Sequence, residues 1–228
     1  INGALLPGDT TVLLAPTNIG KTTAMITVAI HNVQRGKHVL FMFHEGRQED
    51  IEEKVWCCML DCSKAELSER INYLYTQKPE LYVRITKGLS ERLVLLPVFG
   101  AGIAVEDVDA LVERKLQEHF SKTGRRFDLI VDDYPAKLTS NALRSGVFQK
   151  RNFDQYVYQY FVAMALKHDL HVLTAIQTNR TGSKINKGQG DDRLIMMEDV
   201  NESYGPMQDV SNVISINRSP LAEARQRL

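Results

Sequence analysis

The sequence predicts an α/β fold in which a mostly parallel, twisted β-sheet carries helices on both faces. Three observations indicate this. Short apolar runs recur along the chain, and they are continuous rather than alternating, as in strands buried on both sides. Amphipathic helical patterns separate them, so that right-handed crossovers can connect parallel strands. Polar residues directly follow several runs, at the strand ends where open α/β sheets bind ligands.

A candidate phosphate-binding loop lies between the first strand and the first helix. Residues 12–14 are a buried-strand run, and the apolar residues after Lys21 keep one helical face as far as Gly36. Backbone N–H groups of such a loop attract phosphate, while Lys21 reaches the β- and γ-phosphates and the Thr22 hydroxyl binds Mg²⁺. Ala15 departs from G-x-x-x-x-G-K-[ST] at its first glycine. We expect the nucleotide to contact Ala15, Pro16, Thr17, Asn18, Ile19, Gly20, Lys21, Thr22 and Thr23. The alternative is a chance loop before an amphipathic helix.

The second strand, predicted at 37–43, is followed at once by His44 and Glu45. A glutamate at the end of the strand after the phosphate loop is well placed to polarise the water that attacks a γ-phosphate. Glu45 is therefore the candidate catalytic base. The alternative is an ordinary solvated carboxylate at the start of the next helix.

The middle of the chain is less regular. A helix is predicted from residue 48 to about residue 70, and its first acidic residues are interpreted as helix N-terminal and surface charge. Residues 72–102 show an irregular pattern, with 93–96 as the clearest strand. A helix follows over 105–121, and its predicted apolar face consists of Val108, Leu111, Val112, Leu116 and Phe120.

The strand predicted at 127–134 ends in Asp132 and Asp133. An apolar run ending in acids has the form of a Walker B strand, whose terminal aspartate holds Mg²⁺ directly or through water. Side chains alternate along a strand, so only one of the two carboxylates can face the nucleotide. The alternative is a buried strand end that carries two acids and no metal.

Three further elements complete the pattern. Aromatic and aliphatic residues at helical spacing over 153–165 predict a helix whose aromatics belong to the core. The strand at 171–176 ends in Gln177, which can hydrogen-bond the γ-phosphate or the attacking water. The last visible strand covers 212–216.

Two loops are candidates for nucleic-acid contact. Residues 135–152 contain four basic residues and no acidic ones, and residues 178–196 are rich in Gly, Lys and Asn. Such loops beyond the carboxyl ends of central strands can track a phosphate backbone, or they can be solvated surface loops. The candidate DNA-binding residues are Lys137, Arg144, Lys150, Arg151, Lys184 and Lys187.

Composition gives few exclusions. The 228 residues carry 28 basic and 28 acidic side chains, so there is no global basic signature. No apolar run is long enough to span a bilayer and no signal peptide is visible, so we expect a cytoplasmic protein. Cys57, Cys58 and Cys62 are interpreted as idle or buried thiols rather than a zinc site. We expect residues 1–228 to be a single domain cut from a longer protein.

At these motifs the sequence resembles a known family. A-P-T-N-I-G-K-T, F-H-E, L-I-V-D-D-Y and A-I-Q-T-N-R, in this order, are similar to the RecA-type ATPase core of DnaB-type replicative helicases. The resemblance continues through residues 198–213 and covers the chain from about Gly3 to Arg218, although 63–100 match loosely. Asn201 and Tyr204 depart from the family's usual Arg and Gly. The arginine finger of the family is not visible after the last strand.

The resemblance implies a RecA-like P-loop NTPase fold and specific roles. An N-terminal domain and the last C-terminal strands of the family are then missing from residues 1–228. The family tolerates alanine at the position of Ala15. The implied roles are Lys21 and Thr22 as ligands of the phosphates and Mg²⁺, Glu45 as catalytic base, Gln177 as γ-phosphate sensor, and Asp133 rather than Asp132 as the Walker B acid.

The implied function is an ATP-dependent motor of DNA replication. The family forms hexameric rings that draw single-stranded DNA through the centre on loops matching 137–152 and 181–203. A primase or a helicase loader is then the expected protein partner. Two alternatives use the same nucleotide motifs: a RecA- or RadA-like recombination or repair ATPase that forms filaments, and a nucleotide-dependent switch or loader that binds a protein partner.

Overall fold

The computed structural model describes most of the chain. The described residues are 6–16, 19–98, 103–133, 135, 138–139, 150–178, 195–196, 199 and 209–217, and for residues 150–154 the description covers the backbone alone. Within these ranges, no helix is both long enough and apolar enough to cross a membrane.

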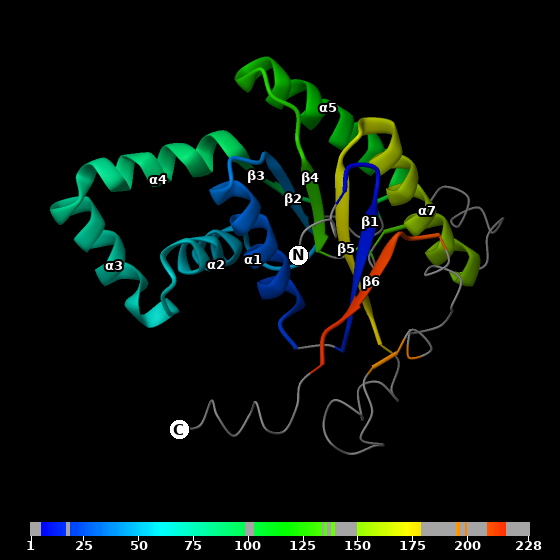
Figure 1. The fold of residues 1–228 in the computed structure, drawn as a ribbon. Coiled ribbons are helices and arrows are strands. Elements are labelled where there is room, and N and C mark those ends of the chain that lie inside the picture. The colour runs from blue at the N-terminus through cyan, green and yellow to red at the C-terminus, as the bar shows by residue number, and fades with distance from the viewer. Residues whose placement is uncertain are drawn as a thin grey trace.

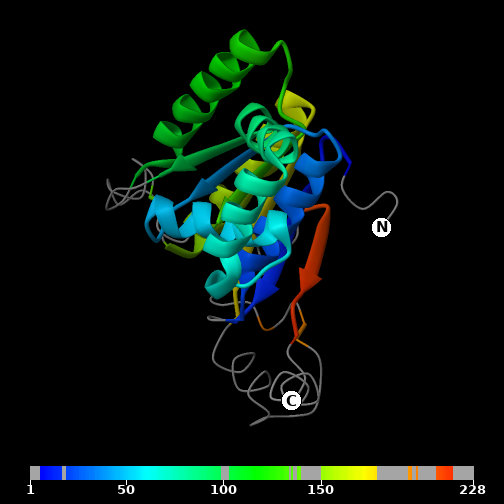
Figure 2. The same ribbon diagram turned by 90° about the vertical axis from the view of Figure 1, so that its left-hand side faces the viewer.

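Six parallel strands form one twisted sheet in the order β3-β2-β4-β5-β1-β6. They are β1 (Thr10–Ala15), β2 (Val39–Phe43), β3 (Leu93–Pro97), β4 (Leu129–Asp133), β5 (His171–Gln177) and β6 (Asn212–Ser215). Because every strand runs the same way, the carboxyl ends meet at one edge of the sheet, which is the lower edge in Figure 1. Figure 2 shows the twist that fans the strands out. All six strands lie within one or two residues of the predicted runs.

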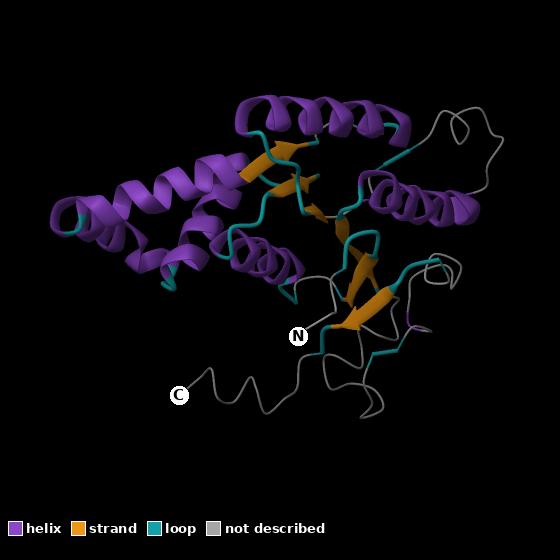
Figure 3. Cartoon of the chain, turned by 45° about the horizontal axis from the view of Figure 1, so that its top comes forward, coloured by secondary structure: helices purple, strands orange, loops and turns teal. Residues whose placement is uncertain are grey.

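Helices cover both faces of the sheet (Figure 3). They are α1 (Lys21–Gln34), α2 (Gln48–Leu60), α3 (Lys64–Gln77), α4 (Pro79–Arg92), α5 (Val105–Thr123) and α7 (Lys150–His168). One apolar cluster joins the sheet to α1, α2 and α4, and a second joins it to α5 and α7. The predicted α/β class, with a mostly parallel sheet and helices on both faces, is confirmed.

The alternation of side chains along the central strands assigns each residue to one of the two faces. In β2, Val39, Phe41 and Phe43 pack against the α1 side, whereas Leu40 and Met42 pack against the α5 and α7 side. The same alternation runs through the neighbouring strands because their registers are fixed by the ladder hydrogen bonds. It therefore also decides which polar residues at the strand ends face the phosphate loop.

Two helical predictions were wrong. The helix expected over residues 48–70 is two helices, because α2 ends at Leu60 and Asp61 adopts a left-handed backbone with φ of 48°. Residues 72–98 are largely regular: α3 continues to Gln77, α4 covers Pro79–Arg92 and β3 follows directly. Figure 1 shows α3 and α4 extending as a hairpin beyond the β3 edge of the sheet.

The helix predicted at 105–121 is present as α5, with one correction to its apolar face. Phe120 is 52% exposed, whereas the polar neighbour His119 is buried and its ring stacks on Phe127 at 4.0 Å between centroids. A flat imidazole that packs as an aromatic ring carries no hydrophobic signal in a periodicity count.

Candidate functional site

The phosphate loop connects the carboxyl end of β1 to the first turn of α1. Ala15 and Pro16 are buried, and Gly20 caps α1 with φ of 91°, a left-handed conformation that favours glycine. Thr17 and Asn18 lie outside the described residues. The first turn of α1 carries no acidic residue, so the positive partial charge of its N–H groups has no acidic counter-charge within that turn.

Lys21 lies at the centre of this loop. Its ammonium donates hydrogen bonds to the main-chain oxygens of Ala15 at 3.1 Å and Pro16 at 2.8 Å. Burial lowers the pKa of Lys21, and the nearby carboxylates of Asp133 and Glu45 act in the opposite direction. Lys21 of α1 is thus close to two carboxylates, that of Glu45 after β2 and that of Asp133 at the end of β4.

Asp132 and Asp133 face opposite sides of the sheet, as the alternation predicts. The Thr22 hydroxyl hydrogen-bonds Asp133, and burial raises the pKa of the Asp133 carboxyl while Thr22 and Lys21 partly offset that rise. Asp132 is fully buried on the other face, where it contacts His44. Asp133 is therefore the carboxylate that lies beside the phosphate loop.

A cleft of about 910 Å³ opens at this edge and collects the predicted residues. Its walls include Gly20 to Thr23 from α1, Asp133 from β4 and Gln177 from β5, and Glu45 follows β2. Gln177 pairs in register with Ala15, which places it directly beside the start of the phosphate loop. Strand and helix ends thus place these side chains around a single cavity of the size that binds small molecules.

The donors at the cleft suit a magnesium ion. The Thr22 hydroxyl and the Asp133 carboxylate are hard oxygen ligands, and their hydrogen bond shows that they can reach a common point. In the part of the chain that the structure describes, there is no cluster of three or more His, Cys, Asp or Glu residues that could hold a metal. Mg²⁺ usually takes its remaining ligands from water and substrate phosphates, so these two donors fit it.

The cleft also has lining residues that the sequence analysis did not assign to a site. Among them, Asp50, Lys54 and Cys57 come from α2 and Lys64 from the start of α3. Lys64 forms an ion pair with Glu53 at 2.8 Å, and the positive charge of Lys54 acts on Asp133. The sequence contains a pattern that could have identified them, since residues 50, 54 and 57 share one face of the helix that follows Glu45. They were not assigned to the site because the fold of α2 over the cleft was unknown.

Most of the predicted DNA-binding residues cannot be placed. Lys137, Arg144, Lys184 and Lys187 lie outside the described residues. Lys150 and Arg151 are the first two residues of α7, for which the backbone alone is described. The assignment of all six residues to DNA binding therefore stays a prediction.

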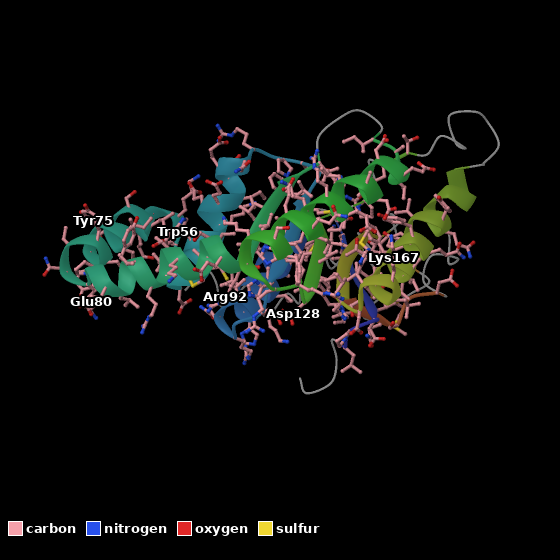
Figure 4. All side chains as sticks on the ribbon, turned by 90° about the horizontal axis from the view of Figure 1, so that it is seen from above. Trp56, Tyr75, Glu80, Arg92, Asp128 and Lys167 are labelled. Atoms are coloured by element: carbon pink, nitrogen blue, oxygen red, sulfur yellow. The ribbon has the colours of Figure 1, made fainter. Side chains whose placement is uncertain are left out.

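A second cleft, of about 950 Å³, lies at the opposite edge of the sheet and contains none of the predicted site residues. Its basic residues include Arg35, Arg92 and Lys122, at or beside the C-terminal ends of α1, α4 and α5. Figure 4 labels Arg92 together with Asp128 at this edge. Helix C-termini favour cations, which accounts for the charge of this cleft.

The comparisons with known proteins agree with this geometry. The chain is 26% identical over 232 residues to a DnaB-like replicative helicase of Enterobacteria phage T4, covering 99% of this chain and 46% of the relative. The sequence-based resemblance to DnaB-type helicases is confirmed. No protein-family model matches the chain. Since the chain spans about half the length of this relative, the activity of the whole protein is a matter for proposal.

Solved structures support the fold. One of them, described as an ATPase domain, superimposes with a TM-score of 0.72 at 15% identity, covering 93% of this chain and 70% of that one. A DnaB-like replicative helicase, described with its interactions with primase, gives 0.71 at 15% identity and covers 96% of this chain and 49% of that one. The RecA-like fold predicted from the resemblance is therefore confirmed.

Proposed function

We propose that this chain is the ATP-dependent motor domain of a replicative DNA helicase, which hydrolyses ATP to translocate on single-stranded DNA and unwind duplex. One observation carries the proposal: the cleft at the carboxyl edge of the sheet joins the phosphate loop to Asp133, Glu45 and Gln177. The similarity to a DnaB-like replicative helicase supports the choice of this activity among the many that use a phosphate loop.

Each predicted site residue that lines the cleft has a proposed role in phosphoryl transfer. The N–H groups at the start of α1 bind the phosphates, and the Lys21 ammonium neutralises charge that develops on the transferred group. Thr22 and Asp133 would hold Mg²⁺, which would supply further charge neutralisation. Glu45 is exposed at the mouth of the cleft, where it can accept a proton from the attacking water. Gln177 hydrogen-bonds the γ-phosphate and relays nucleotide state to the loop after β5.

The proposal extends to partners. Single-stranded DNA would contact the two loops that carry Lys137, Arg144, Lys150, Arg151, Lys184 and Lys187. A homohexameric ring would place these loops around a central strand. A primase or a helicase loader would be the protein partner, and one solved relative is described with its interactions with primase. A cytoplasmic location stays a prediction.

ATP hydrolysis by the full chain, measured with and without single-stranded DNA, tests the proposal. Lys21→Ala is expected to lower the hydrolysis rate by about 100-fold or more, since it removes the charge that stabilises the transferred phosphoryl group. Glu45→Gln is expected to retain ATP binding and lose turnover, because the carboxamide cannot accept the proton. Lys87→Ala and Glu80→Gln, on exposed positions of α4, are the matched controls and should hydrolyse ATP normally.

The oligomeric mass distinguishes the alternatives. DNA-stimulated hydrolysis in a closed hexamer supports the helicase motor, whereas the same stimulation in open filaments favours a recombinase. ATP binding without any effect of DNA would favour the nucleotide-dependent switch. Wild-type turnover by Glu45→Gln would show that Glu45 is not the catalytic base.

A further inference from the structure

A buried chain of polar side chains connects the neighbouring strands β2, β4 and β5 on the face away from the phosphate loop. Its members are His44 directly after β2, Asp132 in β4 and Thr174 in the middle of β5, which we call the polar network. The His44 Nε2–H donates to Asp132 Oδ1 at 2.6 Å. The Thr174 hydroxyl lies 3.2 Å from the main-chain oxygen of Asp132 and 3.4 Å from its Oδ2.

Because this network is buried, its polar groups cannot replace a lost partner with water. The side chains of His44 and Asp132 are 1% and 0% exposed, and Thr174 is also fully buried. A buried carboxylate that loses a donor cannot turn to water, so removing one partner costs far more than the hydrogen bond contributes on its own. The three side chains therefore hold one another in a single arrangement.

Each member of the network is tied by the backbone to a residue of the nucleotide cleft. His44 precedes Glu45, and Asp132 precedes Asp133. The His44 N–H also donates to the main-chain oxygen of Asp133 at 3.1 Å, which extends the β2–β4 ladder beyond the last residue of β2. Thr174 lies in β5, three residues before Gln177.

The alternation of side chains along the strands places the cleft residues and the network residues on opposite faces of the sheet. Asp133 and Gln177 face the phosphate loop, and Asp132 and Thr174 face the α5 and α7 layer. The cleft residues are thus held from behind the sheet by groups that never enter the cleft. A shift of one strand end along its neighbour would move both sets together.

We propose that His44, Asp132 and Thr174 are positioning residues, which hold Glu45 and Asp133 at the separation that phosphoryl transfer requires. This inference rests on the proposed ATP hydrolysis. Its physical basis is the sensitivity of reaction rates to displacements of the order of 1 Å in catalytic groups, which affect kcat more than substrate binding.

Thr174→Val is the first test, because valine matches threonine in shape and removes only the hydroxyl. We expect kcat for ATP in the full chain to fall by about tenfold while KM changes by less than about twofold. Thr10→Val is the matched control: Thr10 is also fully buried and its hydroxyl contacts a main-chain oxygen, that of Phe161, but it lies at the start of β1. The control should lose similar stability and keep its kcat.

Hydrogen exchange gives a readout that does not depend on turnover. Because the His44 N–H is bonded to Asp133, the peptide that contains residues 43–46 should exchange faster in Thr174→Val than in Thr10→Val. Equal kcat in the two variants would overturn the inference, and equal exchange would show that the Thr174 hydroxyl does not hold the end of β2 in place.

Two substitutions at His44 test the donor itself. His44→Gln keeps an N–H near the position of Nε2 and is expected to retain most of the kcat, whereas His44→Leu leaves Asp132 without this donor and should lose activity. If His44→Leu does not fold, Thr174→Val and His44→Gln still decide the matter. Wild-type protein without any ATP hydrolysis would refute the proposed function, while normal hydrolysis by Thr174→Val would refute only the positioning role.

Discussion

At the scale of single residues, the adjacent carboxylates Asp132 and Asp133 show how the sheet assigns chemistry. Asp133 is half-buried beside Thr22 and Lys21, and Asp132 is sealed behind the sheet against His44. Neither environment is a property of aspartate. Both follow from the two-residue repeat of a strand that has a different layer on each face. One position along the chain separates a group that can bind a cation from one that can only brace its neighbour.

Gly20 gives a prediction at the same scale. Its φ of 91° is unfavourable for any L residue, and among the described residues beyond its two chain neighbours no atom lies within 4 Å of an added Cβ. Gly20→Ala should therefore cost about 1–2 kcal/mol of unfolding free energy, mainly through backbone strain. Urea unfolding measures this cost. Because Gly20 begins the turn that presents its N–H groups to phosphate, the variant should also bind ATP more weakly.

Gly36→Ala is the matched control for this substitution. Gly36 has φ of 82° and equally open surroundings, but it follows the other end of α1. It should lose a similar unfolding free energy and bind ATP normally. Equal ATP affinity in the two variants would show that the conformation of Gly20 does not matter for nucleotide binding.

Some contacts of the site could be predicted from the sequence, and others could not. The alternation of Asp132 and Asp133 follows from local geometry, so one of the two had to face the nucleotide. The contact between His44 and Asp132 depends on β2 and β4 being neighbours, although 88 positions separate the two residues. No local pattern contains that order of strands. The same holds for Lys54 and Lys64, which join the cleft through the placement of α2 and α3.

At the scale of elements, the break between α2 and α3 separates one predicted helix into two. Asp61 ends α2 in a left-handed conformation, and Ser63 then begins α3. The Ser63 N–H and hydroxyl both donate to the Glu66 carboxylate, at 2.9 Å and 2.7 Å. These contacts lower the pKa of Glu66 and form a capping box at the start of α3.

The break was predictable in principle. Ser-x-x-Glu before a helical pattern is a start signal for a helix, and residues 63–66 carry it. The apolar spacing of α2 continued closely enough to conceal the interruption. Pro79 had a similar effect later, since it lay inside a stretch interpreted as irregular when it is the first residue of α4. Strand runs were easier to predict because their apolar residues are consecutive.

Ser63→Ala is expected to lower the unfolding free energy by about 1 kcal/mol, because the first turn of α3 loses its cap. Denaturant unfolding measures the loss, and hydrogen exchange should locate it in α3. Ser90→Ala is the control, since Ser90 lies near the other end of the hairpin in α4 and its hydroxyl bonds the preceding turn, at Lys87. A loss that is equal in the two variants would contradict the capping role.

At the scale of the whole molecule, each of the two edges of the sheet has its own cleft. The carboxyl edge holds the nucleotide cleft, and the amino edge holds the second cleft with the ends of α1, α4 and α5. His38 and His119 contact each other at 2.9 Å beside that amino edge. Burial lowers the pKa of His119 from its usual 6.5 to about 4, with smaller contributions from His38 and Lys122.

Acid should therefore destabilise the molecule from the amino edge. Between pH 6.5 and about 4 the unfolded chain binds a proton that folded His119 does not, so this contribution to stability is complete above pH 6.5 and is lost as the pH falls. His119→Gln should make the decrease in unfolding free energy between about pH 7.5 and about pH 5 shallower. His31→Gln, on an exposed position of α1, is the control. An unchanged pH dependence in His119→Gln would exclude His119 as a cause.

The order of the strands in the sheet also determines when each strand can pair while the chain is being synthesised on the ribosome. Among the described strands, β1 pairs only with β5 and β6, which are translated last, whereas β2 can pair with β3 and then β4 much earlier. The apolar segment that carries the phosphate loop is thus translated before the other five strands, and it remains unpaired for a time on the order of ten seconds at ordinary translation rates until β5 is made. During that interval the nascent chain exposes an unpaired strand, and the nucleotide cleft cannot form until β5 has paired with β1.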